Sequence, residues 1–254
     1  MGCALIPAVP DDSHTSLGWS TAGRLLVGEM TPRTWRLGLR PADLTLVVVD
    51  GAGAAQRELP LAGRTFDQAL AWAAEALGGA APGPPPYPMP DHAVGQGGEF
   101  GGRDRDALGE LERWYASADA LLRDFVSSHP HAEDRASPVR CWPHHFDIAT
   151  LVSIPGGAPG EARTIGVGLS PGDGSYAEPY FYVTPWPAPD GATLPELPAG
   201  ASWNRAGWLG AVLTATAIFR DDEGSPPARA QMVRDFLDVS ARASETLLVV
   251  GSNL

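Results

Sequence analysis

The chain of 254 residues contains no lysine, because all 18 of its basic side chains other than histidine belong to arginine. Enzymes that bind pyridoxal phosphate (PLP) through a Schiff base need a lysine amine, and so does the Walker A phosphate loop. The sequence therefore excludes a PLP cofactor and a P-loop nucleotide site.

Positive charge is scarce as a whole. The 30 acidic residues outnumber the 18 arginines, and the formal net charge at pH 7 is -12. Proteins that bind the phosphate backbone of nucleic acids rely on clustered positive charge. We expect no nucleic acid partner.

Long hydrophobic runs and cysteines are also lacking. The longest apolar run, around residues 44–49, is far shorter than the roughly 20 residues that a membrane-spanning helix needs. The start of the sequence has neither the basic region nor the sustained apolar core of a secretory signal. The two cysteines, Cys3 and Cys141, form no CxxC site and fit a reducing compartment. We expect a cytoplasmic protein with no membrane association.

Short strands separated by turns dominate the pattern, and the 30 glycines and 25 prolines argue against a helical bundle. The fold class predicted is α+β, with mostly antiparallel sheets covered by helices. The two halves have similar layouts of a β-meander followed by a helix, which leaves an ancient duplication open. Strands are expected at residues 25–30, 35–40, 44–50, 57–61, 148–154, 163–169 and 180–184, and within 210–219.

Three segments have helical signals. Thr65 and Gln68 form a capping box, and Gly78 supplies the stop. Residues 104–128 form an amphipathic helix, and the last helix begins at Ser225. The buried stripes predicted are Phe66, Leu70, Ala73 and Leu77 in the first helix, and Met232, Phe236, Val239 and Ala243 in the last. His129, after the central helix, is expected to be solvated or to cap that helix.

Residues 81–103 are rich in proline and then in glycine, and cannot hold a regular element for long. They predict a linker or a lid, with a proline-rich ligand at residues 84–90 as the weaker alternative. The domain division predicted is residues 1–80, the connector 81–103, and residues 104–254, which can also form one continuous domain.

Residues 140–187 concentrate histidines, acids and aromatics. If strands 148–154 and 163–169 pair antiparallel, the loop 170–179 returns to the sheet edge where His144, His145 and Asp147 lie. Asp173 and Glu178 can then converge on these residues. Such nitrogen and oxygen ligands suit Zn, Mn or Fe, and the metal set predicted is His144, His145 and Glu178. We therefore predict a polar small-molecule or divalent metal site at this edge, where a metal would activate water or polarise a carbonyl.

A structural interpretation competes with this site. Adjacent histidines before a strand project in different directions, and no established zinc spacing is present. Tyr180 and Tyr182 share one face of a strand, where they either line a groove for a ligand or pack under a helix. The alternative function is a non-catalytic binding or protein-interaction module whose histidines and aromatics are structural. The sequence leaves the choice between enzyme and binding module, and the oligomeric state, open.

One familiar motif matches the sequence by letter alone, and another is missing. Gly168 to Gly172 matches GxSxG, but Pro171 and the following glycines forbid the helix that a nucleophile elbow requires after Ser170. No GxGxxG follows a strand, so the sequence predicts no NAD site.

Four segments together resemble an uncharacterised bacterial family known as a domain of unknown function. They are RTFDQALAWAAEALG (64–78), SPVRCWPHHFDIATL (137–151), GLSPGDGSYAEPYFYVTPWP (168–187) and SWNRAGWLGAVL (202–213). The resemblance implies a soluble bacterial protein and brings no activity or catalytic residues with it.

Overall fold

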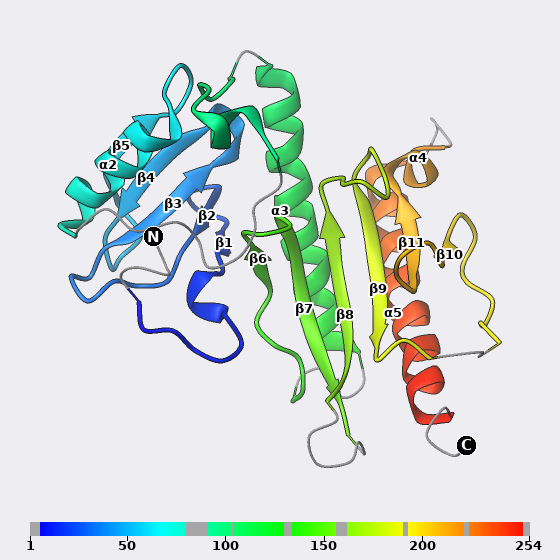
Figure 1. Ribbon diagram of the computed structural model, residues 1–254. Coiled ribbons are helices and arrows are strands. Elements are labelled where there is room, and N and C mark those ends of the chain that lie inside the picture. The colour runs from blue at the N-terminus through cyan, green and yellow to red at the C-terminus, as the bar shows by residue number, and fades with distance from the viewer. Residues whose placement is uncertain are drawn as a thin grey trace. The chain divides into compact units, whose positions relative to one another are not determined.

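The computed structural model describes residues 6–79, 91–102, 104–129, 134–155, 162–189, 193–220 and 224–250. The chain divides into two compact units, of which unit 1 comprises Met1–Ala116 and Arg140–Phe146. Unit 2 comprises Ser117–Val139 and Asp147–Leu254. The structure contains two antiparallel sheets with helices, which confirms the predicted α+β class (Figure 1). The boundaries between the units fall after residues 116, 139 and 146, whereas the predicted connector covered residues 81–103. The proline-rich part of the predicted connector lies outside the described residues.

Unit 1 is built on a five-stranded antiparallel meander in sequential order. Its strands are β1 (Gly18–Ser20), β2 (Leu25–Val27), β3 (Arg36–Arg40), β4 (Thr45–Val49) and β5 (Ala55–Pro60). Strands β2 to β5 lie where strands were predicted, whereas the short β1 was not predicted. Leu59, Leu61 and Ala69 form the core between this sheet and the helix that follows, with Leu39, Leu44, Leu46, Trp72 and Phe100 packed around them.

Helix α2 (Phe66–Leu77) begins and ends as its sequence predicts. The Thr65 hydroxyl accepts from the Gln68 amide at 3.3 Å, and the Gln68 side chain accepts from the Thr65 amide at 3.0 Å. Gly78 ends the helix with a φ of 68°, in the left-handed region where glycine is favoured. The prediction for Phe66 was wrong, since its side chain is 47% exposed. As the first helical residue it faces solvent, while Ala73 and Leu77 are buried.

Helix α3 (Arg105–Ser128) contributes its first half to unit 1 and its second half to unit 2. In unit 1 the fully buried Tyr115 stacks on Trp19, with ring centroids 6.4 Å apart. Strand β6 (Arg140–Trp142) joins the same unit through a bridge between Leu17 and Cys141, and Cys141 is buried. Unit 1 is therefore assembled from parts of the sequence that lie far apart.

Unit 2 contains five of the six strands of the second sheet, in the order β10-β11-β9-β8-β7. The strands are β7 (Asp147–Ile154), β8 (Arg163–Ser170), β9 (Tyr180–Trp186), β10 (Ser202–Asn204) and β11 (Gly210–Thr214). The short helix α4 (Ala215–Ile218) and the long helix α5 (Pro226–Val250) follow. Among these strands all but β10 were predicted, helix α5 was predicted, and α4 was not. The antiparallel pairing of β7 with β8 is confirmed.

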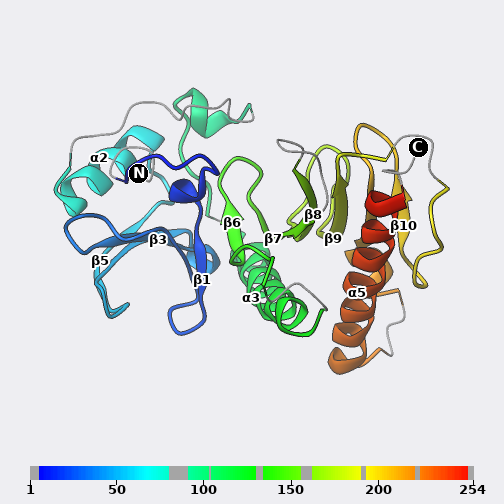
Figure 2. The ribbon, with the colours of Figure 1, turned by 90° about the horizontal axis from the view of Figure 1, so that it is seen from below.

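The two faces of the unit 2 sheet differ in character. Helix α5 and the second half of α3 lie on one face, as the two views in Figures 1 and 2 show. Apolar side chains of alternating strand positions fill the buried layer: Ile148, Val152, Ile165, Val167, Leu169, Phe181, Val183 and Leu213. The intervening positions carry Asp147, Ala149, Gly168, Tyr180 and Tyr182 on the opposite face, which we call the aromatic face.

One of the two alternatives for His129 and the prediction for Val239 were wrong. His129 is not solvated, because its side chain is only 2% exposed and its Nδ1 lies 2.9 Å from Asp238 Oδ1. The partner is 109 residues away, so no local pattern could reveal it. Val239 was expected in the buried stripe of α5 but is 40% exposed. Among the helices of the described residues, none combines the length and apolar character needed to cross a membrane.

Candidate functional site

The aromatic face owes its shape to the strand register. Gly168 of β8 lies directly opposite Tyr182 of β9 and Ala149 of β7, so these three positions form one row across the sheet. A Cβ atom on Gly168 would lie 2.7 Å from the Tyr182 hydroxyl. Because glycine has no side chain, the Tyr182 ring can lie across β8 and reach the neighbouring strand.

Tyr182 is anchored on that neighbouring strand. Its hydroxyl donates a hydrogen bond to Asp147 Oδ2, at the first residue of β7. The bond joins β9 to β7 over the intervening β8. Asp147 was a predicted site residue, and the structure places it with Tyr182 on one face.

Tyr180 is anchored in a similar way at the end of β8. Its hydroxyl donates to Asp173 Oδ2 at 2.6 Å, while Asp173 Oδ1 accepts from the amides of Ser175 (2.7 Å) and Tyr176 (3.1 Å). Tyr180 is 3% exposed. Burial, followed by the hydrogen bond to Asp173, raises the pKa of Tyr180 above its ordinary value of 10.0. The phenol therefore stays protonated and acts as a donor at neutral pH.

Four aromatic rings pack together around these anchors. Ring centroids are 4.8 Å apart for Tyr176 and Tyr180, and 6.2 Å apart for Tyr180 and Tyr182. Trp208, from the loop between β10 and β11, lies 6.4 Å from Tyr180 and 6.5 Å from Tyr182. Tyr176, Tyr182 and Trp208 are half-buried, so part of each of these side chains still faces solvent. We call these four residues the ring cluster.

The loop that carries Trp208 is held by polar contacts. The Asn204 side-chain amide donates to the Trp208 carbonyl at 2.7 Å, and the indole N–H of Trp208 donates to Ser175 Oγ at 3.3 Å. Trp208 is therefore fixed both to its own loop and to the loop that contains Asp173.

Glu178 has a different environment from the other predicted acids. Its Oε2 accepts from the Thr216 amide at 2.6 Å and from the Thr216 hydroxyl at 2.7 Å, at the start of α4. The Thr216 hydroxyl, with burial opposing it and the Thr216 amide adding to it, lowers the pKa of Glu178. A carboxylate held in this way supports the first turn of α4.

His144 and His145 belong to unit 1, in the turn between β6 and β7. Both are exposed, and their rings contact edge to face with centroids 4.7 Å apart. Phe146 follows His145 in the sequence, and within unit 1 its carbonyl accepts a hydrogen bond from the Tyr115 hydroxyl. Across the residues that the structure describes, no group of three or more His, Cys, Asp or Glu side chains is placed to hold a metal ion.

The sequence identified part of this arrangement. It placed Asp147, Asp173, Tyr180 and Tyr182 among the candidates, and the structure brings these four together. It missed the roles of Gly168 and Trp208. The signal for Gly168 was present in principle, because the alternation of Gly166 and Gly168 along β8 leaves room for large rings opposite. Trp208 lies in a loop, where periodicity gives no information.

Comparison with protein-family models, curated proteins and solved structures found no match to this chain. The likeness to a bacterial family therefore stays a prediction, and the functional argument rests on the chemistry of the site.

Proposed function

We propose that unit 2 binds a small polar molecule on its aromatic face. One observation carries the proposal: the carboxylates of Asp147 and Asp173 hold the hydroxyls of Tyr182 and Tyr180. This fixes the half-buried Tyr182 ring over Gly168 and the buried Tyr180 ring beside it. Residues that hold large amphipathic side chains in one orientation reduce the ordering cost of binding.

The side chains favour a ligand with two features. The faces of Tyr176, Tyr182 and Trp208 suit a flat or apolar surface, and aromatic groups of this kind contribute much of the binding energy in small-molecule sites. The carboxylates of Asp147 and Asp173 accept hydrogen bonds, so hydroxyl or amine donors suit the rim. A reducing, cytoplasmic setting belongs to the same proposal and is supported by the low cysteine content.

A fragment screen by nuclear magnetic resonance tests this function. Polyols, amines and carboxylic acids, each with and without a planar ring, are added to ¹⁵N-labelled protein while the tryptophan indole signals are followed. We expect ring-containing polyols and amines to shift the Trp208 indole signal, and carboxylic acids to leave it unchanged. Absence of any shift at Trp208 from all classes would contradict the proposal.

The protein-interaction alternative is favoured by a separate observation on the same face. Leu151 is 45% exposed and Trp186 is 64% exposed, and the register places them on neighbouring rows of β7 and β9. Exposed apolar side chains on one sheet face are typical of protein contacts. If a second copy of the chain docks there, sedimentation of the wild-type protein will show self-association that the Leu151→Ser/Trp186→Ser variant loses.

A further inference from the structure

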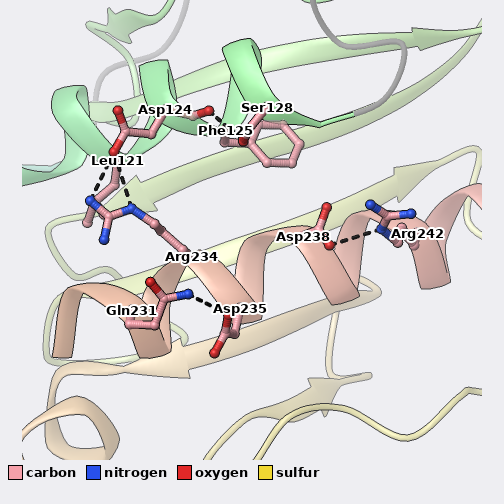
Figure 3. Close-up of a pocket in the computed structure, with 9 residues that line it drawn as sticks. All are labelled: Leu121, Asp124, Phe125, Ser128, Gln231, Arg234, Asp235, Asp238 and Arg242. Atoms are coloured by element: carbon pink, nitrogen blue, oxygen red, sulfur yellow. Dashed lines mark hydrogen bonds and ion pairs between the residues drawn. The ribbon is translucent and has the colours of Figure 1, made fainter. Parts of the chain in front are cut away.

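A pocket lies on the helical side of unit 2, on the sheet face opposite the aromatic face. It has a volume of about 320 Å³ and is lined by residues of the second half of α3 and of α5 (Figure 3). This volume falls at the lower end of the range for small-ligand sites. Leu121 and Phe125, both buried, supply its apolar part.

Most charges around this pocket are balanced within the protein. Arg234 of α5 reaches across to Asp124 of α3 at 3.0 Å, and Arg242 lies 2.9 Å from Asp238 Oδ2 (Figure 3). The other oxygen of Asp238 lies 2.9 Å from the buried His129. The pairs of Arg234 with Asp124 and of Asp238 with His129 connect α5 to α3 and the residue that follows it, whereas the pair of Arg242 with Asp238 lies within α5. Both arginines that line the pocket therefore have an acidic partner.

Asp235 is the exception among the acids that line the pocket. Its hydrogen bond comes from the Gln231 side-chain amide at 2.8 Å, a neutral donor. Within the described part of the chain, no arginine or histidine lies within ion-pair distance of Asp235. The pocket therefore combines an apolar wall with one carboxylate whose charge is not balanced. An acidic chain of net charge -12 further disfavours an anionic ligand.

We propose that this pocket binds a small organic monocation with a short apolar chain, such as an alkylammonium ion. The ammonium group pairs with Asp235, and the alkyl chain lies against Leu121 and Phe125. Arg234 and Arg242 flank the site, and each is already paired with an acid, which leaves Asp235 as the carboxylate that the ligand neutralises. The site is separate from the aromatic face and does not depend on the function proposed there.

Titration with three probes of equal chain length tests the charge requirement. n-Butylammonium, butan-1-ol and butyrate are each added to the full-length ¹⁵N-labelled protein, and backbone amide shifts are followed. We expect saturable shifts with n-butylammonium at residues 121–128 and 231–242, and weaker or no shifts with the alcohol and the carboxylate. Equal responses to the alcohol and the ammonium ion would overturn the proposal, and so would the absence of saturable shifts.

Two matched variants separate a local site from a general effect of net charge. Asp235→Asn retains the volume and removes the charge, while Asp67→Asn makes the same change in net charge at an exposed position of α2. Because Asp235 is exposed, we expect n-butylammonium to bind Asp235→Asn about threefold to fivefold more weakly. Binding to Asp67→Asn should equal that of the wild type. Equal weakening in both variants would overturn the proposal.

Discussion

Gly168 and Tyr182 illustrate how single residues build the aromatic face. The ring of Tyr182 crosses β8 because residue 168 lacks a side chain, and its hydroxyl then reaches Asp147 on the far strand. Tyr180 is fixed by Asp173 instead, within a tight turn. Each tyrosine is thus held by one hydrogen bond to a carboxylate, and a single substitution can remove either bond.

Replacing Tyr182 by Phe should destabilise the protein by about 1–2 kcal/mol, because the half-buried Asp147 carboxylate loses a donor. Tyr176→Phe is the matched control, since its hydroxyl lies 3.4 Å from Asn204 Oδ1 and makes only a weak bond. Urea denaturation measures both free energies of unfolding. Equal losses in the two variants would show that the bond to Asp147 contributes little.

Gly168→Ala should cost about 1–3 kcal/mol through overpacking. The added Cβ would lie 2.7 Å from the Ala149 Cβ and 2.8 Å from the Ile148 carbonyl, besides displacing the Tyr182 hydroxyl. Gly166→Ala, on the same strand and face, is the control because the nearest atoms to its Cβ are 3.9 Å away. We expect the urea midpoint of Gly166→Ala to equal or exceed that of the wild type. A Gly168→Ala variant with a higher urea midpoint than Gly166→Ala would refute the packing argument.

At the scale of elements, α5 covers the sheet of unit 2 with several small residues. Ser240 and Ser244 are 0% exposed, and within the described structure their hydroxyls have no hydrogen-bond partner. A buried hydroxyl without a partner is unfavourable, so small size rather than polarity explains serine at these positions.

The double variant Ser240→Ala/Ser244→Ala should therefore be as stable as the wild type or more stable by up to about 2 kcal/mol. Thermal unfolding followed by circular dichroism measures the change. Thr65→Ala is a useful contrast, since loss of the α2 capping box should destabilise by about 1 kcal/mol. A double alanine variant that unfolds at a lower temperature would indicate that these hydroxyls do make stabilising bonds.

The contact between Asp238 of α5 and His129, which follows α3, should stabilise the protein less at low pH. Burial raises the pKa of Asp238, but hydrogen bonds from Arg242 and His129 outweigh it and lower the pKa below the ordinary value of 3.8. The stabilisation that follows is fully present above the unfolded-state pKa near 3.8 and is lost as the pH falls through the lower folded-state value. Asp238→Asn should thus be less stable than the wild type at pH 6, with the difference shrinking below pH 4. A difference that is constant from pH 6 to pH 2 would contradict this assignment.

The elements that were predictable from sequence are those with local signals. The strands β7, β8 and β9 alternate clearly, and the α2 capping box is encoded within four residues. The short strands β1 and β10 have three residues each and no such pattern. His129 and Trp208 acquire their partners through tertiary contacts, so their environments could not be deduced from neighbouring residues.

At the scale of the whole molecule, the two units are interleaved in sequence. Unit 1 needs Glu112 and Tyr115 of α3, which contact Arg24 and Trp19, and it needs residues 140–146 for the bridge to Leu17. The predicted division at residues 81–103 would separate the five-stranded sheet from these residues of unit 1, which all come later in the sequence.

A fragment of residues 1–103 should therefore not fold alone, because the buried Trp19 loses the Tyr115 ring that stacks on it and Leu17 loses its bridge to Cys141. A fragment of residues 1–146 restores every part of unit 1 and should show dispersed amide signals with a cooperative thermal transition. Cooperative unfolding of residues 1–103 would contradict this description of unit 1.

The central claim is that the ring cluster of unit 2 binds a small polar molecule, and its most direct test is the dissociation constant of the tightest fragment, measured by calorimetry. We predict that Trp208→Leu weakens this fragment at least about tenfold, as loss of an aromatic contact worth about 1.4 kcal/mol would do. Trp186→Leu, on the same face but outside the ring cluster, should leave the dissociation constant unchanged. Equal dissociation constants for the wild type and Trp208→Leu, with both folded, would contradict the account.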